Sequence, residues 1–277
     1  MNEFKPDAVI GTGGYASGPV LRVAAKRKIP TLIQEQNSYP GITNRILSKR
    51  VDRICVAYSG MEKYFPKEKI LVTGNPVRQD IINLQGKRER GQETFGLKSG
   101  KKTLLIIGGS QGAMTINESI AASIEELIKN NIQVIWQTGK LFFEKGKELA
   151  IMYHNDGIRV YEFISKMDLA YAVADAVVSR AGAISVSELC LVKKASILVP
   201  LPSAAEDHQT KNAMALVNHH AAVLVKDPEA KQKLVKQVIA LMNDAASIEK
   251  LENNVASLAY TNSADVIASE VLRLINK

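Results

Sequence analysis

The chain has 277 residues, of which 46 % are hydrophobic and 23 % are charged, and its formal net charge is +8 at pH 7. This length exceeds the size at which one core usually keeps growing, so we expect two folded domains and not a disordered chain. No apolar run reaches the roughly 18 residues that cross a bilayer, and the first residues lack the pattern of a signal peptide. The sequence therefore predicts a cytoplasmic protein without a membrane-spanning segment.

The positive charge is concentrated in the first part of the chain. Residues 1–101 hold 18 Lys and Arg against 9 Asp and Glu, a net of +9, whereas residues 102–277 hold 18 against 19, a net of −1. A basic half-protein commonly meets phosphate on nucleic acid, anionic lipid or a charged substrate, although a solvated surface without a partner gives the same count. Aromatic residues are only 5 %, so we expect a membrane surface or a charged substrate and no nucleic acid.

Short β-branched runs alternate with helical patterns along the whole chain, which is typical of repeated βαβ units and parallel sheets. In the first part we predict strands over residues 7–11, 31–35, 53–57 and 70–73, with helical stretches over 17–27 and 42–50. A second series of strands is predicted over residues 103–107, 133–137, 159–163, 175–179, 196–200 and 222–225. The fold class is therefore α/β, and the second series matches a complete doubly wound domain.

The charged, glycine-containing stretch 84–102 is predicted to be an interdomain linker between a first domain over 1–83 and a second over 103–262. The first domain is short by two or so βα units, so either it is naturally small or the chain lacks its beginning. Residues 263–277 form an amphipathic pattern that needs a surface to cover, and we expect this helix to fold back on the first domain.

Two glycine-rich turns follow predicted strands, one in each domain. In the second domain, LLIIGGSQGA (104–113) runs into a helix, so Ser110 and the backbone N–H groups beside it suit a diphosphate. In the first domain, VIGTGGYASGP (9–19) repeats the arrangement. Each turn by itself could also be a tight connection without a ligand, and neither spacing fits a dinucleotide or Walker motif.

Polar residues also follow two later strands of the second domain. SRAGAISVSE (179–188) places Glu188 inside a helix, where it could bind sugar hydroxyls or simply complement the helix dipole. The next polar loop holds His208 and Gln209; the amide suits a neutral sugar, whereas a lone His in such a loop is more often solvated. Neither paired carboxylates nor Cys and His at metal spacing occur, so we expect no metal, and Cys55 and Cys190 are predicted core thiols.

Six motifs in order resemble those of the MurG family of bacterial peptidoglycan glycosyltransferases. They are GTGGYASGP, QEQNSYPGITNR, VTGNPVR, GGSQGA, SRAGAISVSE and EDHQTKNA. The resemblance implies a GT-B fold with two Rossmann-like domains, the first of them incomplete. It also implies inverting transfer of N-acetylglucosamine from UDP-N-acetylglucosamine to the C4 hydroxyl of undecaprenyl-diphospho-N-acetylmuramoyl-pentapeptide, without a cofactor, at the cytoplasmic face of the membrane.

The resemblance assigns roles to particular residues. The implied donor-binding residues are Asn37, Arg78, Ser110, Gln111, Gly112, Ile164, Ala183, Ile184, Ser185, Val186, Ser187, Glu188 and Gln209. Within this set, Ser110 and the amides after it would contact the diphosphate, the Ile164 backbone the uracil, and Glu188 the ribose. Asn37 and Gln209 would hold the sugar. The implied glycine loop on the acceptor side comprises Gly11, Gly13, Gly14 and Tyr15.

The sequence departs from the family at its front, where the family has a further loop, GGTGGH, whose histidine is a candidate catalytic base. Because this loop does not occur here, we expect a fragment or an internal start, an unassigned catalytic base, and weak donor binding and turnover by this chain. The alternatives are another GT-B enzyme such as a UDP-N-acetylglucosamine 2-epimerase, and a non-catalytic or split-subunit module that binds nucleotide sugars.

Overall fold

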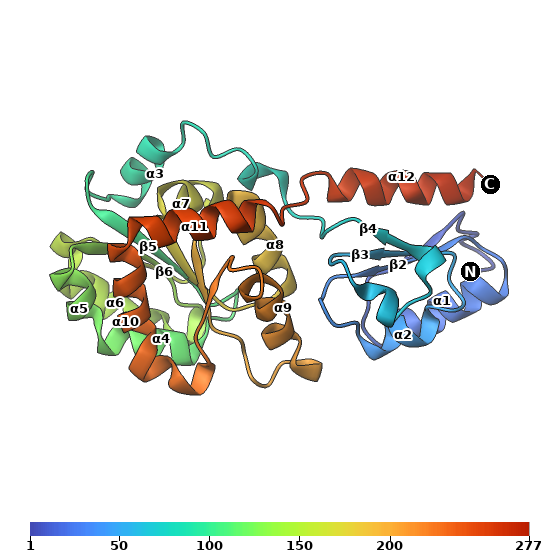
Figure 1. Cartoon of the computed structure of the whole chain (residues 1–277), viewed down its shortest axis with the longest axis horizontal. Helices are drawn as coiled ribbons and strands as arrows, with labels where there is room; N and C mark the ends of the chain where they lie inside the picture. Colours follow the sequence, from blue (N-terminus) through green and yellow to red (C-terminus); the bar gives the residue numbers. More distant parts are fainter. Residues whose placement is uncertain (277) are drawn as a thin grey trace. The chain divides into compact units, whose positions relative to one another are not determined.

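The computed structural model describes residues 1–276 and divides into two compact units. Unit 1 consists of Met1–Val77 together with the residues from Tyr260 onward, and unit 2 consists of Arg78–Ala259. Each unit is a parallel sheet covered by helices on both faces (Figure 1). The expected α/β class with two Rossmann-like units is confirmed.

Unit 1 is built on a four-stranded parallel sheet in the order β1-β2-β3-β4. Its elements are β1 (Val9–Gly11), α1 (Ser17–Lys26), β2 (Thr31–Glu35), α2 (Ile42–Leu47), β3 (Arg53–Val56), β4 (Ile70–Val72) and α12 (Ser263–Ile275). Alternate strand residues serve the two faces of the sheet: Ile33 packs with α1 and α2, while Leu32 packs with α12. The described part of the C-terminal tail therefore covers the second face of the sheet in unit 1.

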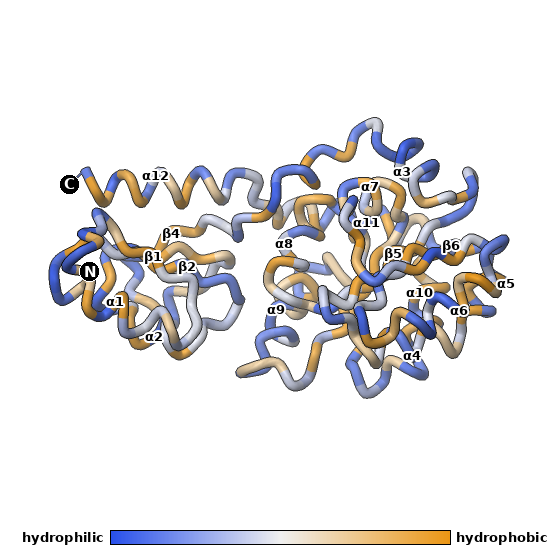
Figure 2. The backbone as a smooth tube through the Cα atoms, turned by 180° about the vertical axis from the view of Figure 1, so that it is seen from behind, coloured by the Kyte–Doolittle hydropathy of each residue, from blue (hydrophilic) through white to orange (hydrophobic). Residues whose placement is uncertain are grey.

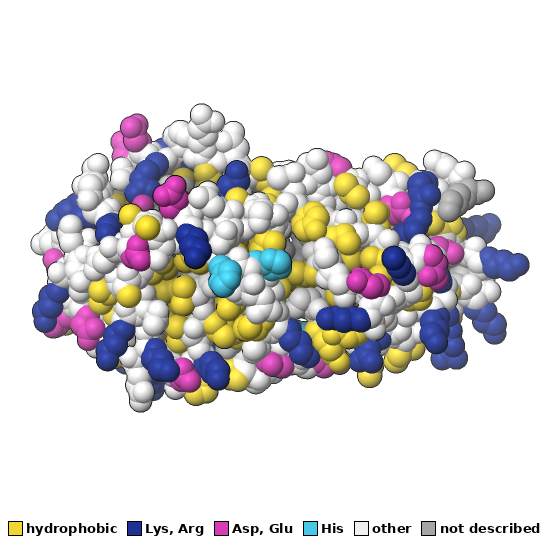
Figure 3. Space-filling model, in the orientation of Figure 1, with side chains coloured by type: hydrophobic (Ala, Val, Ile, Leu, Met, Phe, Trp, Pro, Cys, Tyr) yellow, Lys and Arg dark blue, Asp and Glu magenta, His cyan; other side chains and the backbone are white. Residues whose placement is uncertain are grey.

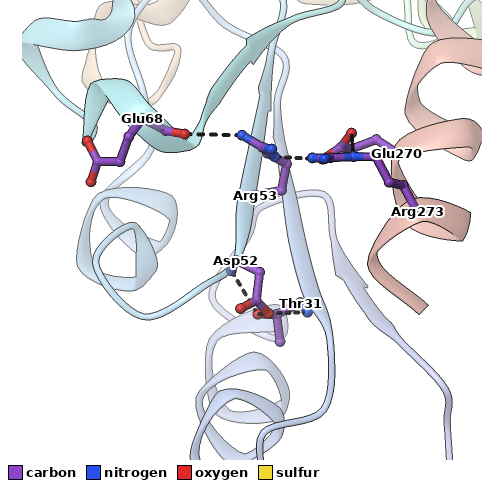
Figure 4. A network of polar contacts seen from close by, with 6 residues as sticks. All are labelled: Thr31, Asp52, Arg53, Glu68, Glu270 and Arg273. Atoms are coloured by element: carbon purple, nitrogen blue, oxygen red, sulfur yellow. Dashed lines mark hydrogen bonds and ion pairs between the residues drawn. The ribbon is translucent and has the colours of Figure 1, made fainter. Parts of the chain in front are cut away.

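Helix α12 alternates hydrophobic and hydrophilic residues along its length (Figure 2) and sets Leu274 against Leu32 and Cys55. A polar network fixes its register on the sheet (Figure 4). Arg53 Nε lies 2.6 Å from Glu270 Oε1, and Arg273 donates to both oxygens of the same carboxylate at 2.7 and 2.9 Å. The hydrogen bonds and positive charges of the two arginines lower the pKa of Glu270, so it remains ionised.

Unit 2 contains a six-stranded parallel sheet in the order β10-β9-β8-β5-β6-β7. Its strands are β5 (Lys102–Ile107), β6 (Ile132–Gln137), β7 (Ile158–Tyr161), β8 (Ala176–Ser179), β9 (Ser196–Leu198) and β10 (Val223–Leu224). Its helices are α3 (Arg88–Phe95), α4 (Met114–Ala122), α5 (Ile124–Lys129), α6 (Phe143–Met152), α7 (Met167–Val173), α8 (Ala183–Val192), α9 (His208–Val217), α10 (Ala230–Asn243) and α11 (Ala245–Ala256). Leu104 and Ile106 face the cluster with α4 and α10, whereas Leu105 and Ile107 face the cluster with α7 and α8.

The predicted linker over 84–102 is wrong, because this stretch is a docked part of unit 2. Helix α3 packs on α7, with Phe95 only 5 % exposed. A Cβ on Gly91 would lie 2.8 Å from the Leu169 carbonyl oxygen, so glycine permits the close approach. The ion pairs Lys87–Asp168 (2.8 Å) and Arg88–Asp175 (2.9 Å) use the charges that suggested a solvated linker.

The unit boundaries shift accordingly. The chain passes from unit 1 to unit 2 at Val77–Arg78, not after residue 83, and it returns at Ala259–Tyr260, not after residue 262. Both cysteines are buried free thiols, as predicted, and burial raises the pKa of each to about 12. Among residues 1–276, no helix combines the length and apolar character needed to cross a membrane.

Gly74 tests the docking of the returning chain onto unit 1. Its φ is +73°, and an added Cβ would lie 2.4 Å from Cβ of Tyr260. We expect Gly74→Ala to lower the free energy of unfolding by about 2–5 kcal/mol, from backbone strain and overlap together. The measurement is a urea titration followed by circular dichroism.

Gly60→Ala is the matched control, since Gly60 has a φ of +78° with no atom within 4 Å of the added Cβ. Backbone strain alone should lower the free energy of unfolding of this variant by about 1 kcal/mol. Equal losses in the two variants would contradict the close contact with Tyr260.

Candidate functional site

The candidate donor site lies at the carboxyl edge of the sheet in unit 2. Strand β5 is the first strand of this sheet in the sequence and lies at its centre. The next two strands, β6 and β7, lie on one side of β5, and the following strand, β8, lies on its other side. The loops after β5 and β8 therefore diverge at a topological switch point, where open α/β sheets commonly bind ligands.

The loop after β5 is pressed against the loop after β6. A Cβ on Gly112 would lie 2.0 Å from the Thr138 carbonyl oxygen, and one on Gly139 would lie 2.3 Å from the Gly112 nitrogen. The Gly112 amide donates to Gly109 O at 3.1 Å, so this amide is used inside the turn. Ser110 and Gln111 are exposed at the tip, just before α4. The donors that we expect to face a diphosphate are therefore those of Ser110 and Gln111.

Gln137, the last residue of β6, joins two of the predicted site segments. Its side-chain amide donates to Gly109 O at 3.0 Å, and its Oε1 accepts from the Ile164 amide at 2.9 Å. The Ile164 side chain is 2 % exposed. Because the Ile164 N–H already has this partner, its carbonyl oxygen is the backbone group that we expect to meet a base. The signal for Gln137 was a polar residue ending a buried strand.

Glu188 on α8 lies between Arg78 and Tyr171. Tyr171 OH donates to Glu188 Oε2 at 3.0 Å, and Arg78 Nε lies 3.4 Å from Oε1. Burial raises the pKa of the Glu188 carboxyl, although Arg78 and the Tyr171 hydroxyl act against this shift. Burial and the Glu188 charge raise the pKa of Tyr171 well above its ordinary value, so its hydroxyl stays a donor.

The start of α8 presents some predicted contact residues and hides one. Ile184 is 43 % exposed, and Ala183, Ser185 and Ser187 are partly exposed. Val186 is 1 % exposed and belongs to the core cluster with α7, so only its backbone remains for the predicted contact with the donor. The helical repeat turns this position toward the sheet while its neighbours face outward.

Gln209 at the start of α9 holds two strand-end loops together. Its Oε1 accepts from the Ala181 amide at 3.2 Å and from the Leu201 amide at 3.0 Å. The side-chain oxygen of Gln209 thus holds the two loops together, and its side-chain NH2 group is the part that we expect to bind a sugar. Residues Glu206 and Asp207, just before it, have φ values of 51° and 55°, which is a strained backbone for non-glycine residues.

In unit 1, Asn37 is oriented by a carboxylate that sequence reasoning missed. Glu35, 2 % exposed at the end of β2, accepts from the Asn37 amide at 3.0 Å, from Asn37 Nδ2 at 3.3 Å and from Gly41 N at 3.1 Å. It also accepts from Asn44 Nδ2 at 2.8 Å. The sequence signal was an acidic residue ending an otherwise buried strand.

The glycine loop of unit 1 lies between β1 and α1. A Cβ on Gly11 would lie 2.2 Å from Leu21 Cδ1, and Gly13 and Gly14 have φ values of +92° and +73°. Tyr15 is 91 % exposed. Gln36 Nε2 donates to Thr12 O at 2.9 Å, which joins this loop to the segment that carries Asn37.

The predicted residues therefore fall into three groups within unit 2 and a further group within unit 1. Arg78 and Glu188 form an ion pair; the Ser110 loop is joined to Ile164 through Gln137; and Gln209 binds the Ala181 amide that precedes α8. Asn37 and the loop from Gly11 to Tyr15 belong to unit 1. Across the described chain, no group of three or more His, Cys, Asp or Glu residues could hold a metal ion.

Comparison with known proteins gives consistent matches over almost the whole chain. Residues 1–56 match the N-terminal domain of glycosyltransferase family 28, and residues 103–270 match its C-terminal domain. A relative from Flavobacterium psychrophilum is 50 % identical over 275 residues, covering 99 % of this chain and 74 % of the relative. One from Parabacteroides distasonis is 48 % identical, covering 100 % of this chain and 75 % of the relative. Both are named UDP-N-acetylglucosamine–N-acetylmuramyl-(pentapeptide) pyrophosphoryl-undecaprenol N-acetylglucosamine transferase.

Solved structures agree with these matches. The crystal structure of Acinetobacter baumannii MurG aligns with a TM-score of 0.80 at 28 % identity, covering 99 % of this chain and 75 % of that protein. A complex of S. aureus MnaA with UDP aligns at 0.71 with 14 % identity, covering 100 % of this chain and 79 % of that protein, which shows a common fold. The chain therefore belongs to glycosyltransferase family 28, among the MurG-type N-acetylglucosamine transferases that its motifs resemble.

Proposed function

We propose that this protein transfers N-acetylglucosamine from UDP-N-acetylglucosamine to the C4 hydroxyl of undecaprenyl-diphospho-N-acetylmuramoyl-pentapeptide. The observation that carries the proposal is that two features flank the switch point of the sheet. One is the glycine loop after β5, and the other is Glu188 on α8, which accepts a hydrogen bond from Tyr171. The family supports the proposal, because the names of its members give this donor and this acceptor.

The donor half of the reaction is assigned to unit 2. The diphosphate binds at the exposed tip of the loop after β5. There it meets the Ser110 hydroxyl, the Gln111 amide and the positive end of the α4 helix dipole. Negative charge builds on that diphosphate as the bond from the anomeric carbon to UDP breaks, so the same groups stabilise the leaving group. Glu188 accepts hydrogen bonds from the ribose hydroxyls, and Arg78 holds its carboxylate from the other side.

The sugar and acceptor are assigned to amides and to unit 1. In unit 2, the NH2 group of Gln209 binds hydroxyls of the N-acetylglucosamine. In unit 1, the loop from Gly11 to Tyr15 binds the acceptor. The acceptor oxygen attacks the anomeric carbon in line with the departing UDP, its proton passes to a general base, and the configuration inverts to a β-1,4 link.

Unit 1 also has a surface that suits an anionic membrane. On α2, Ile42 and Ile46 are 62 % and 64 % exposed, while Asn44 and Leu47 face the core. Arg45, Lys49 and Arg50 are exposed on the same segment. Figure 3 shows Lys and Arg side chains beside hydrophobic ones over this part of unit 1. Basic residues near anionic lipid attract it while shallow apolar contacts add to the binding.

The pH dependence of donor binding tests Glu188. Because its pKa is raised, the Glu188 carboxyl takes up a proton at a higher pH than an ordinary glutamate does. The protonated carboxyl is a weaker hydrogen-bond acceptor for the ribose hydroxyls. We expect affinity for UDP-N-acetylglucosamine to fall as the pH is lowered from about 7.5 to about 4.5. Glu188→Gln should bind about 5 to 150 times more weakly at neutral pH, with a flat pH profile. Isothermal titration calorimetry gives both quantities.

Glu252→Gln is the matched control, since burial also raises the pKa of Glu252, on α11 outside the site. This variant should keep the profile of the unmodified protein. A Glu188→Gln protein with unchanged affinity and pH profile would remove Glu188 from the donor site.

Membrane attachment is tested by sedimentation with lipid vesicles. The protein should bind vesicles that contain phosphatidylglycerol more than pure phosphatidylcholine, and raised salt should release it as charge is screened. Replacing Arg45, Lys49 and Arg50 by glutamine should abolish most of the binding. Replacing the exposed Lys231, Lys233 and Lys236 of α10 removes the same charge from unit 2 and should leave binding unchanged. Equal losses of vesicle binding in the two triple variants would mean that net charge alone attracts the protein to the membrane, and would contradict the role of the surface around α2.

A further inference from the structure

Arg180, the first residue after β8, is a buried cation that binds several strand ends at once. It is 8 % exposed, although arginine is rarely buried without a partner. Its guanidinium donates to Val199 O at 3.0 Å and Pro200 O at 3.3 Å, both just after β9, and it forms an ion pair with Asp227, which follows β10. One side chain therefore ties together the loops after three neighbouring strands.

The ion pair continues to the helix behind the glycine loop. Thr115 Oγ1 donates to Asp227 Oδ1 at 3.1 Å, and Thr115 is the second residue of α4. The other carboxylate oxygen of Asp227 holds Arg180. The first turn of α4 is thereby attached to the strands on the β8 side of the switch point.

The same turn is attached on the β6 side as well. Asn117 Nδ2 donates to Thr138 O at 2.8 Å, and Trp136 Nε1 donates to Asn117 Oδ1 at 2.9 Å. The first turn of α4 is thus held from one side by the part-buried Asp227 and from the other by the buried Asn117 and Trp136. A buried ion pair adds little stability compared with apolar residues of the same volume, so its value lies in fixing geometry.

We propose that Thr115, Asp227 and Arg180 are positioning residues that aim the N-terminal end of α4 at the diphosphate of the donor. This inference rests on the proposed function. The three residues act through the backbone of the loop that ends at Gly112, and the chain Thr115–Asp227–Arg180 sets the direction of the helix dipole and of the loop N–H groups. A small rotation of α4 then weakens contacts with phosphate while leaving contacts with uracil and ribose in place.

The experiment compares UDP with uridine as ligands of the full chain, by calorimetry for UDP and by NMR titration for uridine. Thr115→Val removes the hydroxyl at nearly constant volume. We expect it to lower the affinity for UDP about 10- to 150-fold, which corresponds to one hydrogen bond to a charged group. Its affinity for uridine should remain within about twofold, so the ratio of the two affinities falls.

Two variants serve as controls. Thr115→Ser keeps the hydroxyl and should restore the UDP affinity of the unmodified protein. Ser119→Ala removes a hydroxyl one turn later in α4, which donates to Thr115 O at 2.6 Å within the helix, and it should leave the ratio unchanged. A loss of UDP and uridine binding in parallel would show general loosening of the fold and overturn the positioning role.

The outcomes separate this inference from the proposed function. An unmodified protein that binds UDP no more tightly than uridine would contradict the diphosphate site and thus the proposed function itself. An unmodified protein that prefers UDP, with the same preference in Thr115→Val, would leave the function standing and overturn the role of Thr115, Asp227 and Arg180.

Discussion

Parallel strand pairing is the constraint on which the rest of this structure depends. Every strand pair in the described chain is parallel, so within each sheet all carboxyl ends lie at one edge. Residues far apart in sequence, such as Gln137, Arg180 and Gln209, therefore come together as the loops after successive strands. The reversal of strand order at β5 then separates two of these loops, and a ligand site can form there without any distortion of the sheet.

Polar contacts of Gln137, Arg180 and Gln209 hold the loops at the carboxyl edge of unit 2. Gln137 and Gln209 each satisfy backbone groups of two different loops, and Arg180 satisfies two carbonyl oxygens of the loop after β9 and pairs with Asp227 after β10. Buried polar groups must be matched in this way because an unpaired one is costly. The matching also fixes the loops in one arrangement, which suits the proposed binding of a diphosphate, a ribose and a sugar at this edge.

Unit 1 obtains one face of its core from the far end of the chain. Leu274 and Glu270 on α12 contact β2 and β3, more than 200 positions earlier, through an apolar cluster and an ion pair. The two passages of the chain between the units, at Val77–Arg78 and Ala259–Tyr260, follow from this arrangement. Gly74 lets the outgoing and returning segments approach where a side chain would collide. One face of the sheet in the first unit is thus covered by residues that follow the whole of unit 2 in the sequence.

The sequence by itself determined the strands, the α/β class, the family and the glycine loops, because these depend on local patterns: β-branched runs, helical periodicity and motif order. It misplaced the segment 84–102, where charged residues hide the close packing of Gly91 and Phe95 against α7. It also did not show that the Val186 side chain faces the core, and it overlooked Glu35, Gln137 and Arg180. Only the tertiary structure decided these roles, because the partners of a buried polar group, and the face that a helix residue presents, are set by segments distant in the chain.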